Sequence, residues 1–521
     1  MAMNETLKRS VIPRRAPFSQ GQREWLSGLF SENLLNKQQE QAASDADDEL
    51  ALIDLDEAPW HDMDMPLSKR MALAEDEPFK HRLMAAMAQQ DCGQCGYDCK
   101  GYAGVLAQGQ ETDMSLCVPG GTTTRKQVKA LFAEHGPVEP AGEAAADIGP
   151  VGYDRRNPWS APVKSVIGLH GEGAPKDTRH VVIDLTDSGI EYQPGDSLGV
   201  YARNELELIA PVIVALNADP EMMVKVKGDT EVSLKEALTD WRDITVPSDE
   251  SLEMLAQIAT DGEERALLLG LAQEGVDESG KDLLDILRDF PSARPSIQEL
   301  IDTLGALKPR LYSIASSQRA HPSEVHLTVS VVQYESLGRQ RKGVASNFLA
   351  DRATEHPVPI YLQPAKHFAV QADDIPIIMV GPGTGIAPFR AFLEERHARG
   401  AAGGAWLFFG NPHSHCDFLY QAELEGYLAS GTLTRLSTAF SRDQADKIYV
   451  QDRIREQGAE LWKWLERGAC FYVCGDAEHM APAVEQALRD VVQSHGDYEE
   501  SAASDYINEL VRKERYLRDV Y

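Results

Sequence analysis

Hydrophobic and polar residues are patterned differently in successive parts of this chain. In residues 20–35 the apolar positions recur every three to four residues, which predicts a short amphipathic helix. After about Tyr153 the pattern changes to short β-rich runs bounded by turn residues, typical of a barrel or sandwich, at residues 180–185, 326–332 and 358–362. Between the first two runs, residues 204–304 return to three-to-four spacing with proline breaks, which predicts an inserted helical domain.

Beyond residue 372 strands and helices alternate. Near-continuous apolar runs predict buried strands, with helical patterns between them, at residues 375–380, 405–409, 433–439 and 470–474. Such alternation indicates a parallel, doubly wound α/β sheet. Two linkers are also predicted, an acidic one at residues 42–57 and one rich in proline, glycine and alanine at residues 136–150.

These patterns divide the chain into five parts, so a multi-domain fold is expected. The parts are an N-terminal arm with its helix and acidic linker at residues 1–60, an α-rich cysteine-bearing module at 61–135, a linker at 136–155, an antiparallel β-barrel domain at 156–371 with the helical insert at about 204–304, and an α/β doubly wound domain at 372–521. A length of 521 residues agrees with about three folded domains of ordinary size.

The composition narrows the class of protein. Hydrophobic residues make up 43% of the chain and charged residues 26%, as in ordinary globular proteins. The 51 lysines and arginines against 82 acidic residues leave a formal net charge of −31, which repels nucleic acid and anionic lipid and favours a partner with a basic face. The chain contains neither an apolar run of about 18 residues nor a secretory signal, so we expect a cytoplasmic protein without a membrane span.

Four of the seven cysteines, Cys92, Cys95, Cys99 and Cys117, follow the spacing C-x2-C-x3-C-x17-C. Without a secretory signal, this pattern indicates metal or redox chemistry rather than disulfide bonds. Three thiolates within eight residues, separated by glycines, can wrap a small inorganic core that the distant fourth cysteine closes, which favours a 4Fe–4S cluster. Zinc, which prefers two C-x2-C-like pairs, and a module without metal are the alternatives. The string also resembles the 4Fe–4S modules of electron-transport proteins, although their usual run is C-x2-C-x4-C and the second gap here is one residue shorter.

A glycine-rich turn, GPGTG, lies between the predicted strand 375–380 and a helix that opens at Ala387. Glycines such as Gly383 let the backbone approach a ligand, and the following helix N-terminus offers unpaired N–H groups to phosphate or to a nicotinamide amide. Thr384 adds a hydroxyl at the same turn. The turn is therefore a candidate nucleotide-binding site.

The chain after the predicted strand 433–439 carries two basic residues, Arg442 and Lys447, with a hydroxyl at Ser441 and an aromatic ring at Tyr449. The ligands of an open α/β sheet lie at the carboxyl ends of its strands. Basic side chains there can bind a phosphate and the ring can stack on adenine, whereas an acidic residue would select NAD. NADPH is therefore the expected coenzyme.

Upstream, Arg310 and Tyr312 follow a proline-preceded turn, and residues 343–346 open an apparent helix at 347–352. An arginine and a helix N-terminus together provide a pyrophosphate site, and a tyrosine offers its face to a flat ring system. This combination suits a flavin.

These strings recur in one order: RLYSIASS, HLTVSVVQYE, GVASNFLADR, VGPGTGIAPFRAFLEER, WLFFGNPH, SRDQADKIYVQD, YVCGDAEHMA and YLRDVY. Together they resemble the ferredoxin–NADP reductase superfamily over residues 159–521, and within it the flavoprotein subunits of NADPH-dependent sulfite reductases. The resemblance implies an FAD-binding barrel with a helical insert, followed by an NADPH-binding domain.

The resemblance also implies individual residue roles. The residues that would hold FAD are Thr245, Arg310, Leu311, Tyr312, Ser313, Thr328, Ser330, Tyr334, Gly343, Val344, Ala345 and Ser346. Those that would hold the adenosine and 2′-phosphate of NADPH are Ser441, Arg442, Lys447, Ile448, Tyr449, Val450 and Gln451. Ser313, Cys474 and Asp519 would line the hydride-transfer site, and Tyr521 would cover the flavin ring and move aside for nicotinamide. Ala483 stands where the family usually has an acidic residue.

The implied function is electron transfer from NADPH through FAD and the 4Fe–4S cluster to a haemoprotein. The expected partner is the sirohaem subunit of sulfite reductase, which reduces sulfite to sulfide in sulfur assimilation. Relatives carry an FMN-binding flavodoxin domain ahead of the FAD region, but no phosphate loop of that kind precedes about Tyr153, so the cluster is expected to replace FMN. One alternative is the same route feeding nitrite or nitrate reductase or another haemoprotein. Another is a cluster-bearing redox sensor.

Overall fold

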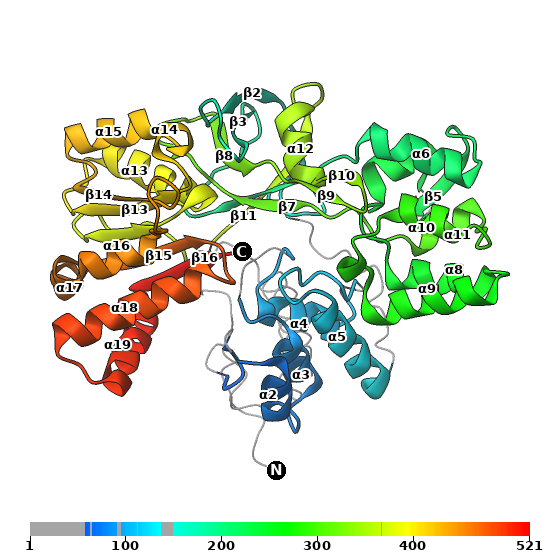
Figure 1. The fold of residues 1–521 in the computed structure, drawn as a ribbon, viewed down its shortest axis with the longest axis horizontal. Coiled ribbons are helices and arrows are strands. Elements are labelled where there is room, and N and C mark those ends of the chain that lie inside the picture. The colour runs from blue at the N-terminus through cyan, green and yellow to red at the C-terminus, as the bar shows by residue number, and fades with distance from the viewer. Residues whose placement is uncertain are drawn as a thin grey trace, which may run out of the picture.

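The structure is a computed structural model that describes residues 58–62, 65–90, 95–111, 113–136, 149–228, 230–365 and 367–521. The predicted helix at 20–35, the acidic linker at 42–57 and most of the second linker lie outside the described residues. Figure 1 shows four parts: a small helical part at the bottom, strands at the top, helices on the right and an α/β part on the left. We call them the cysteine module (residues 58–136), the β unit (149–203 and 305–365), the insert (204–304) and the α/β unit (367–521).

The cysteine module consists of short helices, as its pattern predicts: α2 (Leu67–Leu73), α3 (Phe79–Ala86), α4 (Cys99–Ala107) and α5 (Gly121–His135). They pack around a core that includes the fully buried Trp60, Leu83 and Tyr102. Prolines precede α2 and α3, and Asp98 caps α4 by accepting a hydrogen bond of 2.6 Å from the amide of Gly101. The module thus has its own core, and Cys99 and Cys117 are themselves buried in it.

The β unit contains two antiparallel sheets. One has the order β1-β11-β4-β7 and the other β2-β3-β8, from the strands β1 (Trp159–Ala161), β2 (Val163–Gly168), β3 (Thr178–Asp184), β4 (Ser197–Val200), β7 (Arg310–Ser313), β8 (Glu324–Ser330) and β11 (Val358–Gln363). They share one apolar core, and an isolated bridge between Ile314 and Leu327 joins them. Because the described strands form two sheets, the prediction of a closed barrel is not confirmed.

A hairpin and a helix complete the β unit. The hairpin pairs β9 (Gln333–Ser336) with β10 (Arg339–Lys342), and α12 (Val344–Asp351) follows at once. The predicted helix at 347–352 therefore begins earlier, at Val344, with Gly343 as its N-cap. The strands predicted at 180–185, 326–332 and 358–362 are found within two residues of their expected positions, because alternating β-branched side chains mark them clearly.

The insert is mainly helical: α6 (Leu206–Leu216), α7 (Leu234–Glu236), the π-helix η2 (Ala237–Trp241), α8 (Asp249–Ile258), α9 (Gly262–Glu274), the 3-10 helix η3 (Val276–Ser279), α10 (Leu283–Asp289) and α11 (Ile297–Thr303). Two details of the prediction are wrong. The insert also contains a β-hairpin of β5 (Met223–Lys227) and β6 (Thr230–Ser233), whose alternating valines Val224 and Val226 are buried. Moreover, α6 continues through Pro211, its sixth residue, instead of ending there, although a proline inside a helix removes one backbone hydrogen bond.

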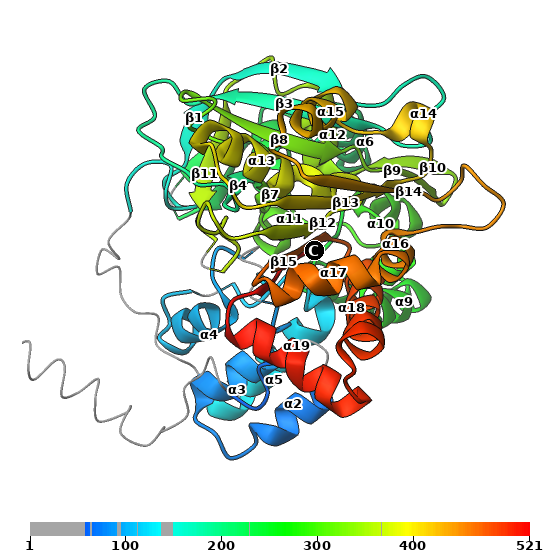
Figure 2. The ribbon, with the colours of Figure 1, turned by 90° about the vertical axis from the view of Figure 1, so that its left-hand side faces the viewer.

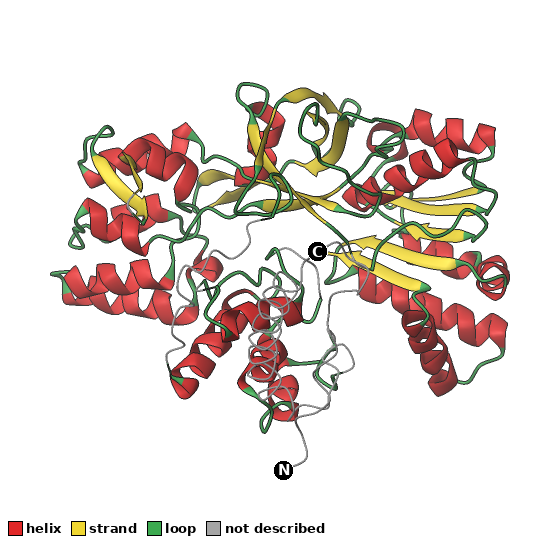
Figure 3. Cartoon of the chain, turned by 180° about the vertical axis from the view of Figure 1, so that it is seen from behind, coloured by secondary structure: helices red, strands yellow, loops and turns green. Residues whose placement is uncertain are grey.

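The α/β unit confirms the doubly wound prediction. Its five strands are all parallel in the order β14-β13-β12-β15-β16: β12 (Ile377–Val380), β13 (Ala405–Asn411), β14 (Arg435–Phe440), β15 (Cys470–Gly475) and β16 (Tyr516–Val520). The order reverses between β12 and β15, and open α/β sheets bind ligands outside the strand ends at such a point. Figure 3 shows this sheet between its covering helices.

Helices cover both faces of this sheet: η4 (Gly383–Ile386), α13 (Ala387–Arg399), α14 (Ser414–Asp417), α15 (Gln421–Ser430), α16 (Val450–Glu456), α17 (Gly458–Glu466), α18 (Met480–Gly496) and α19 (Glu500–Arg512). Alternate residues of β12 therefore enter different cores. Ile378 and Val380 pack in the core with α16 to α19, whereas Ile377 and Met379 pack in the core with α13 and α15. This explains why the strand is apolar without alternation.

A buried arginine joins the α/β unit to the β unit. Arg390, on α13, donates a hydrogen bond of 2.6 Å to the carbonyl of Ala315, just after β7. It also pairs with Glu423 at 2.7 Å and Glu394 at 2.9 Å, and its side chain is 7% exposed. Because an unpaired buried charge is costly, this network holds the two units in one arrangement. Within the described ranges, none of the helices combines the length and the apolarity that a membrane span needs.

Candidate functional site

Three residues predicted for hydride transfer meet where the two units touch. Ser313 ends β7 in the β unit, while Cys474 and Asp519 are paired neighbours on β15 and β16 of the α/β unit. The Ser313 hydroxyl donates a hydrogen bond of 2.6 Å to Asp519 Oδ2, and Cys474 Sγ lies 3.7 Å from the same oxygen. The structure therefore gathers a hydroxyl, a thiol and a carboxyl from three strands.

The surroundings control the protonation of these groups. Burial raises the pKa of Asp519, although the hydrogen bond from Ser313 opposes that rise. Burial also raises the pKa of Cys474 well above its usual range, and the nearby carboxyl of Asp519 raises it further. Cys474 is therefore a thiol at neutral pH, since a thiolate would have to be both desolvated and close to a carboxylate. It can donate a weak hydrogen bond but is not a nucleophile.

Tyr521 lies beside this cluster at the end of β16. Its hydroxyl is 3.1 Å from Thr384 Oγ1, in the turn after β12, and its side chain is about half exposed at 49%. The amide of Tyr521 donates to the carbonyl of Gly475, at the end of β15. The backbone of Tyr521 is thus fixed while one side of its ring remains accessible, as a residue that covers a flat ligand requires.

The glycine-rich turn lies at the point where the strand order reverses. A Cβ on Gly385 would lie 2.1 Å from the carbonyl oxygen of Cys474, so this glycine allows the turn to pack on the end of β15. Gly383 has a φ of +58° with open space at the Cβ position, so its conformation favours glycine. The turn therefore needs one glycine for close packing and another for backbone conformation, and it leads directly into α13.

The basic residues predicted for the coenzyme phosphate lie in the loop after β14. Arg442 and Lys447 are exposed, and neither has an ion-pair partner among the residues that the structure describes. Tyr449 caps α16 and is 44% exposed. In a chain with a net charge of −31, these two exposed cations in one loop make it a candidate anion site.

Other residues predicted for the same coenzyme have different surroundings. Val450 is buried in the core between the sheet and α16, and Ile448 packs against that core. The amides of Ser441 and Arg442 donate to the carbonyls of Asn411 and Pro412, which fixes the start of the loop. Gln451 lies on α16 and is partly buried. Val450 and Ile448 thus anchor the loop, whereas its charged side chains remain accessible.

A cavity of about 480 Å³ lies between the insert and the β unit, within the range of small-molecule sites. Four of the residues predicted to hold FAD line it: Thr245, Tyr334, Gly343 and Val344. No side chain caps the N-terminus of α12 at Gly343, so its amides can bind phosphate. The ring of Tyr334 is 54% exposed and can stack on a base. The cavity therefore fits the adenosine and phosphate part of FAD.

The same cavity contains cationic residues that sequence reasoning missed: Lys281, Arg339, Arg341, Lys342 and Arg352. Arg339 and Arg341 both pair with Asp282 and Asp285, which keeps the hairpin against the insert. A sequence feature that could have indicated these cations is the basic run RQRK at residues 339–342, which stands out in an acidic chain.

The remaining residues predicted for FAD are distributed along the β unit. Arg310 is exposed at the start of β7 and has no ion-pair partner in the described ranges, which suits a phosphate ligand. Leu311 and Tyr312 follow it in β7, and burial raises the pKa of the Tyr312 hydroxyl. Thr328 is buried instead, with its hydroxyl 2.7 Å from that of Tyr420, so it joins the two units.

The last three residues predicted to hold FAD lie on helix α12 and at the end of β8. Ser346 Oγ accepts a hydrogen bond of 3.1 Å from the amide of Val332, and Ala345 is buried in the core of the β unit. Ser330 ends β8 and is partly buried. Ser346 and Ala345 thus position the helix whose N-terminus faces the cavity. Ala483, where the family usually has an acidic residue, lies in the first turn of α18.

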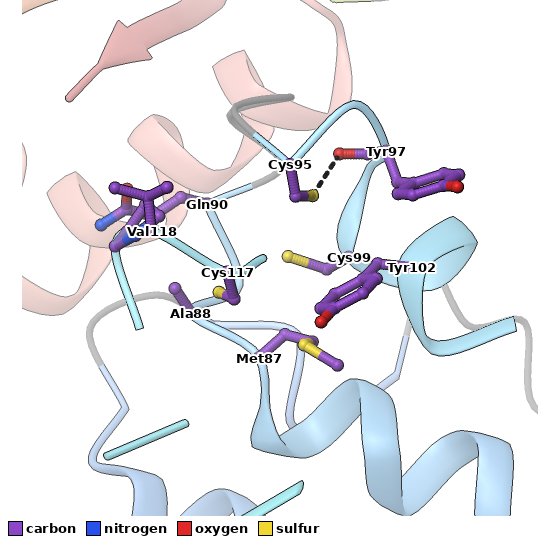
Figure 4. A pocket seen from close by; sticks show the side chains of 10 residues that line it. Met87, Ala88, Gln90, Cys95, Tyr97, Cys99, Tyr102, Cys117 and Val118 are labelled. Carbon is purple, nitrogen blue, oxygen red and sulfur yellow. Dashed lines mark hydrogen bonds between the residues drawn. The ribbon is translucent and has the colours of Figure 1, made fainter. Parts of the chain in front are cut away.

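Three of the four predicted metal-ligating cysteines converge in the cysteine module. Cys95, Cys99 and Cys117 line one small pocket together with Tyr97 and Tyr102, and Figure 4 shows their sulfur atoms directed into it. The fourth, Cys92, lies outside the described residues. Residues 95–99 and residue 117 thus meet although 17 residues separate Cys99 from Cys117.

Several polar groups surround these sulfurs: Cys95 Sγ donates a hydrogen bond of 3.2 Å to the carbonyl of Tyr97. Backbone N–H groups of Ala88 and Gly120 hydrogen-bond to Cys117 and lower the pKa of its thiol, although burial raises it more. The buried guanidinium of Arg70 lies close enough to Cys99 and Cys117 to interact with their charge, and it donates to the carbonyl of Met87. Cys99 is the first residue of α4, where the helix dipole favours negative charge. Three convergent thiols are the ligand type that iron–sulfur clusters use, and hydrogen bonds to sulfur and nearby charge set the reduction potential of such clusters, so the pocket is a candidate cluster site.

Two parts of the chain match known domain families. Residues 152–348 match the family described as FAD binding domain, and residues 379–486 match the family described as oxidoreductase NAD-binding domain. The first match includes the β unit and insert residues around the cavity, and the second includes the glycine-rich turn and the basic loop. Ser313 lies within the first match, and its partner Asp519 lies on β16, which pairs with strand β15 of the second match.

Curated proteins similar to this chain are flavoprotein alpha-components of NADPH sulfite reductase. The protein of Bacillus subtilis (strain 168) is 44% identical over 391 residues, which cover 74% of this chain and 65% of the relative. That of Photorhabdus laumondii is 43% identical over 408 residues, covering 76% and 67%. That of Vibrio cholerae serotype O1 is 45% identical over 373 residues, covering 71% and 60%. The chain thus spans about two thirds of the length of the curated relatives it matches.

The close packing of the glycine-rich turn can be tested with Gly385→Ala. Because the new Cβ would clash with the carbonyl oxygen of Cys474, we expect a loss of about 1–3 kcal/mol in stability, measured by urea unfolding. The matched control is Gly426→Ala, in helix α15 with open space at its Cβ position, which should gain about 0.5–1 kcal/mol. Equal stability of the two variants would contradict the packing role of Gly385.

Proposed function

This chain belongs to the family of flavoprotein alpha-components of NADPH sulfite reductase, and from this premise we propose that it passes electrons from NADPH through FAD and a 4Fe–4S cluster to a haemoprotein. The proposed acceptor is the sirohaem subunit that reduces sulfite to sulfide. The observation that carries the proposal is the contact of Ser313, in the part that matches an FAD-binding domain, with Asp519 of the α/β unit, whose residues 379–486 match an NAD-binding domain. Three converging cysteines in the same chain supply the further redox site.

Bound FAD would supply the conversion of a two-electron hydride into single electrons, which a haem acceptor requires. Thr245, Tyr334 and the N-terminus of α12 would hold its adenosine and phosphate part, and Arg310 would pair with a phosphate. Tyr312 and Tyr521 are the aromatic residues proposed to lie against its ring system. The residues of this chain would thus fix the position of the flavin and exclude water from its ring.

Ser313, Cys474 and Asp519 would position the nicotinamide ring. The hydroxyl and the thiol are both held by Asp519 and so have fixed orientations. The carboxyl group of Asp519 would stabilise the positive charge that develops on the nicotinamide as NADPH loses a hydride. Arg442 and Lys447 would bind the 2′-phosphate, and Tyr449 would stack on the adenine.

The proposed ligands of the cluster are Cys92, Cys95, Cys99 and Cys117. Support comes from the three described sulfurs, which share one pocket, and from the backbone donors and the buried Arg70 around them. An acidic surface with a net charge of −31 supports a haemoprotein partner with a basic docking face, since opposite potentials steer association.

Anaerobic purification of the whole chain tests this proposal directly. We expect one FAD with about four iron and four sulfide per chain, and visible absorption that NADPH bleaches. Addition of a sirohaem sulfite reductase subunit should then give NADPH-dependent sulfide formation. A preparation with neither iron nor sulfide, or one that NADPH does not bleach, would overturn the proposal.

Cys95→Ala extends this test to the metal ligands. Removal of one thiolate should abolish the iron signal in electron paramagnetic resonance and transfer to the haemoprotein, while reduction of ferricyanide by NADPH continues from the flavin. Cys416→Ala is the matched control, because Cys416 is buried in the α/β unit far from the module. An unchanged iron content in Cys95→Ala would exclude that residue as a ligand.

Tyr521→Ala should reduce the preference for NADPH over NADH by about tenfold or more. The Tyr521 ring must move before nicotinamide can stack on the flavin, and moving it costs free energy. NADPH offsets this cost better than NADH, because its 2′-phosphate adds binding free energy. Steady-state kinetics with both coenzymes measure the ratio. Tyr521→Phe keeps the ring and loses only the hydroxyl, which contacts Thr384 and Cys474, so it should retain the preference. An unchanged ratio in Tyr521→Ala would contradict the stacking role.

Arg442→Ala and Lys447→Ala should each raise KM for NADPH by roughly tenfold to a hundredfold, because one charged hydrogen bond contributes about 1.5–3 kcal/mol. KM for NADH, which lacks the 2′-phosphate, should change little. Lys463→Ala removes an exposed lysine of α17 and serves as the control. Equal effects on both coenzymes would assign these residues to general folding rather than to phosphate recognition.

A further inference from the structure

Arg155, at the start of the β unit, contacts the first cysteine loop. Its Nη1 donates a hydrogen bond of 3.1 Å to the carbonyl oxygen of Cys95, and its guanidinium lies 5.1 Å from the ring centre of Tyr97. It also forms an ion pair with Glu111, and both partners are mostly buried, at 20% and 14% exposed. The hydroxyl of Tyr201, next to β4, donates 2.6 Å to the carbonyl of Arg155. The cysteine loop is thus connected to the β unit through one side chain.

Lys308 contacts the second cysteine segment. Its Nζ donates 2.7 Å to the carbonyl and 2.8 Å to the hydroxyl of Ser115, which lies two residues before Cys117. Lys308 itself lies two residues before Arg310, the first residue of β7. The strand that ends with Ser313 and the segment that ends with Cys117 are therefore attached to each other.

Helix α5 makes a third set of contacts, with the insert. Arg125 pairs at 2.6 Å with Asp249, the first residue of α8, and Lys129 pairs with Glu250. Lys126 donates to the carbonyl of Gln273 at the end of α9. The pair of Arg125 and Asp249 is mostly buried, at 18% and 10% exposed, so its separation would leave two poorly solvated charges.

The figures agree with these contacts. In Figures 1 and 2 the cysteine module lies directly beneath the C-terminal end of β16, where Tyr521 is found. The module therefore touches the β unit and the insert on one side of the molecule, next to the proposed flavin site.

We propose that the cysteine module is held permanently against the β unit and the insert, with Arg155 and Lys308 as the positioning residues for its two cysteine segments. This inference rests on the proposed function. For each NADPH oxidised to NADP⁺ with release of one proton, two electrons would leave the flavin singly through the module and reduce two one-electron acceptors. No movement of the module is needed between these transfers.

Fixed docking of the cysteine module matters for the rate of electron transfer. Electron transfer slows steeply with distance, so the module must remain close to the flavin site throughout turnover. Arg155 also neutralises Glu111, so its loss would leave an unpaired carboxylate near the cysteines, and negative charge disfavours a reduced cluster. Loss of Arg155 should therefore slow electron entry and lower the reduction potential at the same time.

Zero-length cross-linking of the whole chain with a carbodiimide tests the docking itself. The reagent activates a carboxylate, and a lysine amine in contact then forms an amide as the urea leaves. We expect a linked peptide pair of Lys129 with Glu250 by mass spectrometry, and a cross-linked chain in which NADPH still reduces the cluster within twofold of the untreated rate. Lys129→Arg keeps the charge, lacks the amine and is the matched control. Absence of the link, or loss of cluster reduction in the linked chain, would overturn the proposal.

Arg155→Gln tests the positioning role, with Arg156→Gln as its control. Arg156 carries the same charge one residue away but pairs with Asp154 instead of the module. In Arg155→Gln we expect faster hydrogen exchange at the amides of residues 95–99. We also expect NADPH to reduce the cluster about tenfold more slowly and the midpoint potential of the cluster to be lower. The rate of ferricyanide reduction should not change. Arg156→Gln should match the unaltered protein in all four. The same behaviour of both variants would exclude Arg155.

These outcomes are separable from failure of the proposed function. If the chain contains no iron or sulfide, the electron route is wrong, while the cross-link and the hydrogen exchange still decide whether the module is docked. If the cluster is present and reduced but the cross-link does not form, the docking is wrong and the proposed function remains.

Discussion

The joint between the β unit and the α/β unit is the constraint on which the site depends. Ser313 and Asp519 belong to different units, and their hydrogen bond exists only if the units keep one arrangement. Arg390 enforces that arrangement from a buried position by donating to the carbonyl of Ala315, two residues after Ser313, and pairing with Glu423. Because an arginine buried without these partners would be strongly destabilising, the units cannot separate slightly without losing several interactions at once.

Cations also connect the other parts of this acidic chain. Arg155 and Lys308 hold the cysteine segments to the β unit, and Arg125 attaches α5 to the insert. Each is mostly buried or hydrogen-bonded, so it is unavailable to an anionic ligand. Arg442 and Lys447 are different, because within the described ranges they have no ion-pair partner. The division between structural and ligand-binding cations thus follows from which positive charges the fold has already neutralised.

Sequence patterns predicted the site residues better than they predicted the strands and sheets around the site. Ser313, Cys474 and Asp519 were singled out by motif and do meet, and three of the predicted cysteines converge. By contrast, the insert's hairpin at β5 and β6 was missed because apolar spacing in a mixed segment is dominated by its helices. Strand patterns left a barrel and a sandwich open, because they define each strand but not how the strands pair, and the barrel that the resemblance implied is not confirmed by the two sheets of the described residues.

The sequence by itself determined the local elements, the glycine-rich turn, the cysteine spacing and the chemical types at the site, because these depend on residues that are neighbours along the chain. Only the tertiary structure decided which groups meet. It assigned Gly385 to packing against Cys474, Thr328 to the contact with Tyr420, and Arg155 to the cysteine loop. The reason is physical: contacts between residues tens or hundreds of positions apart arise from the packing of whole units, which no local pattern encodes.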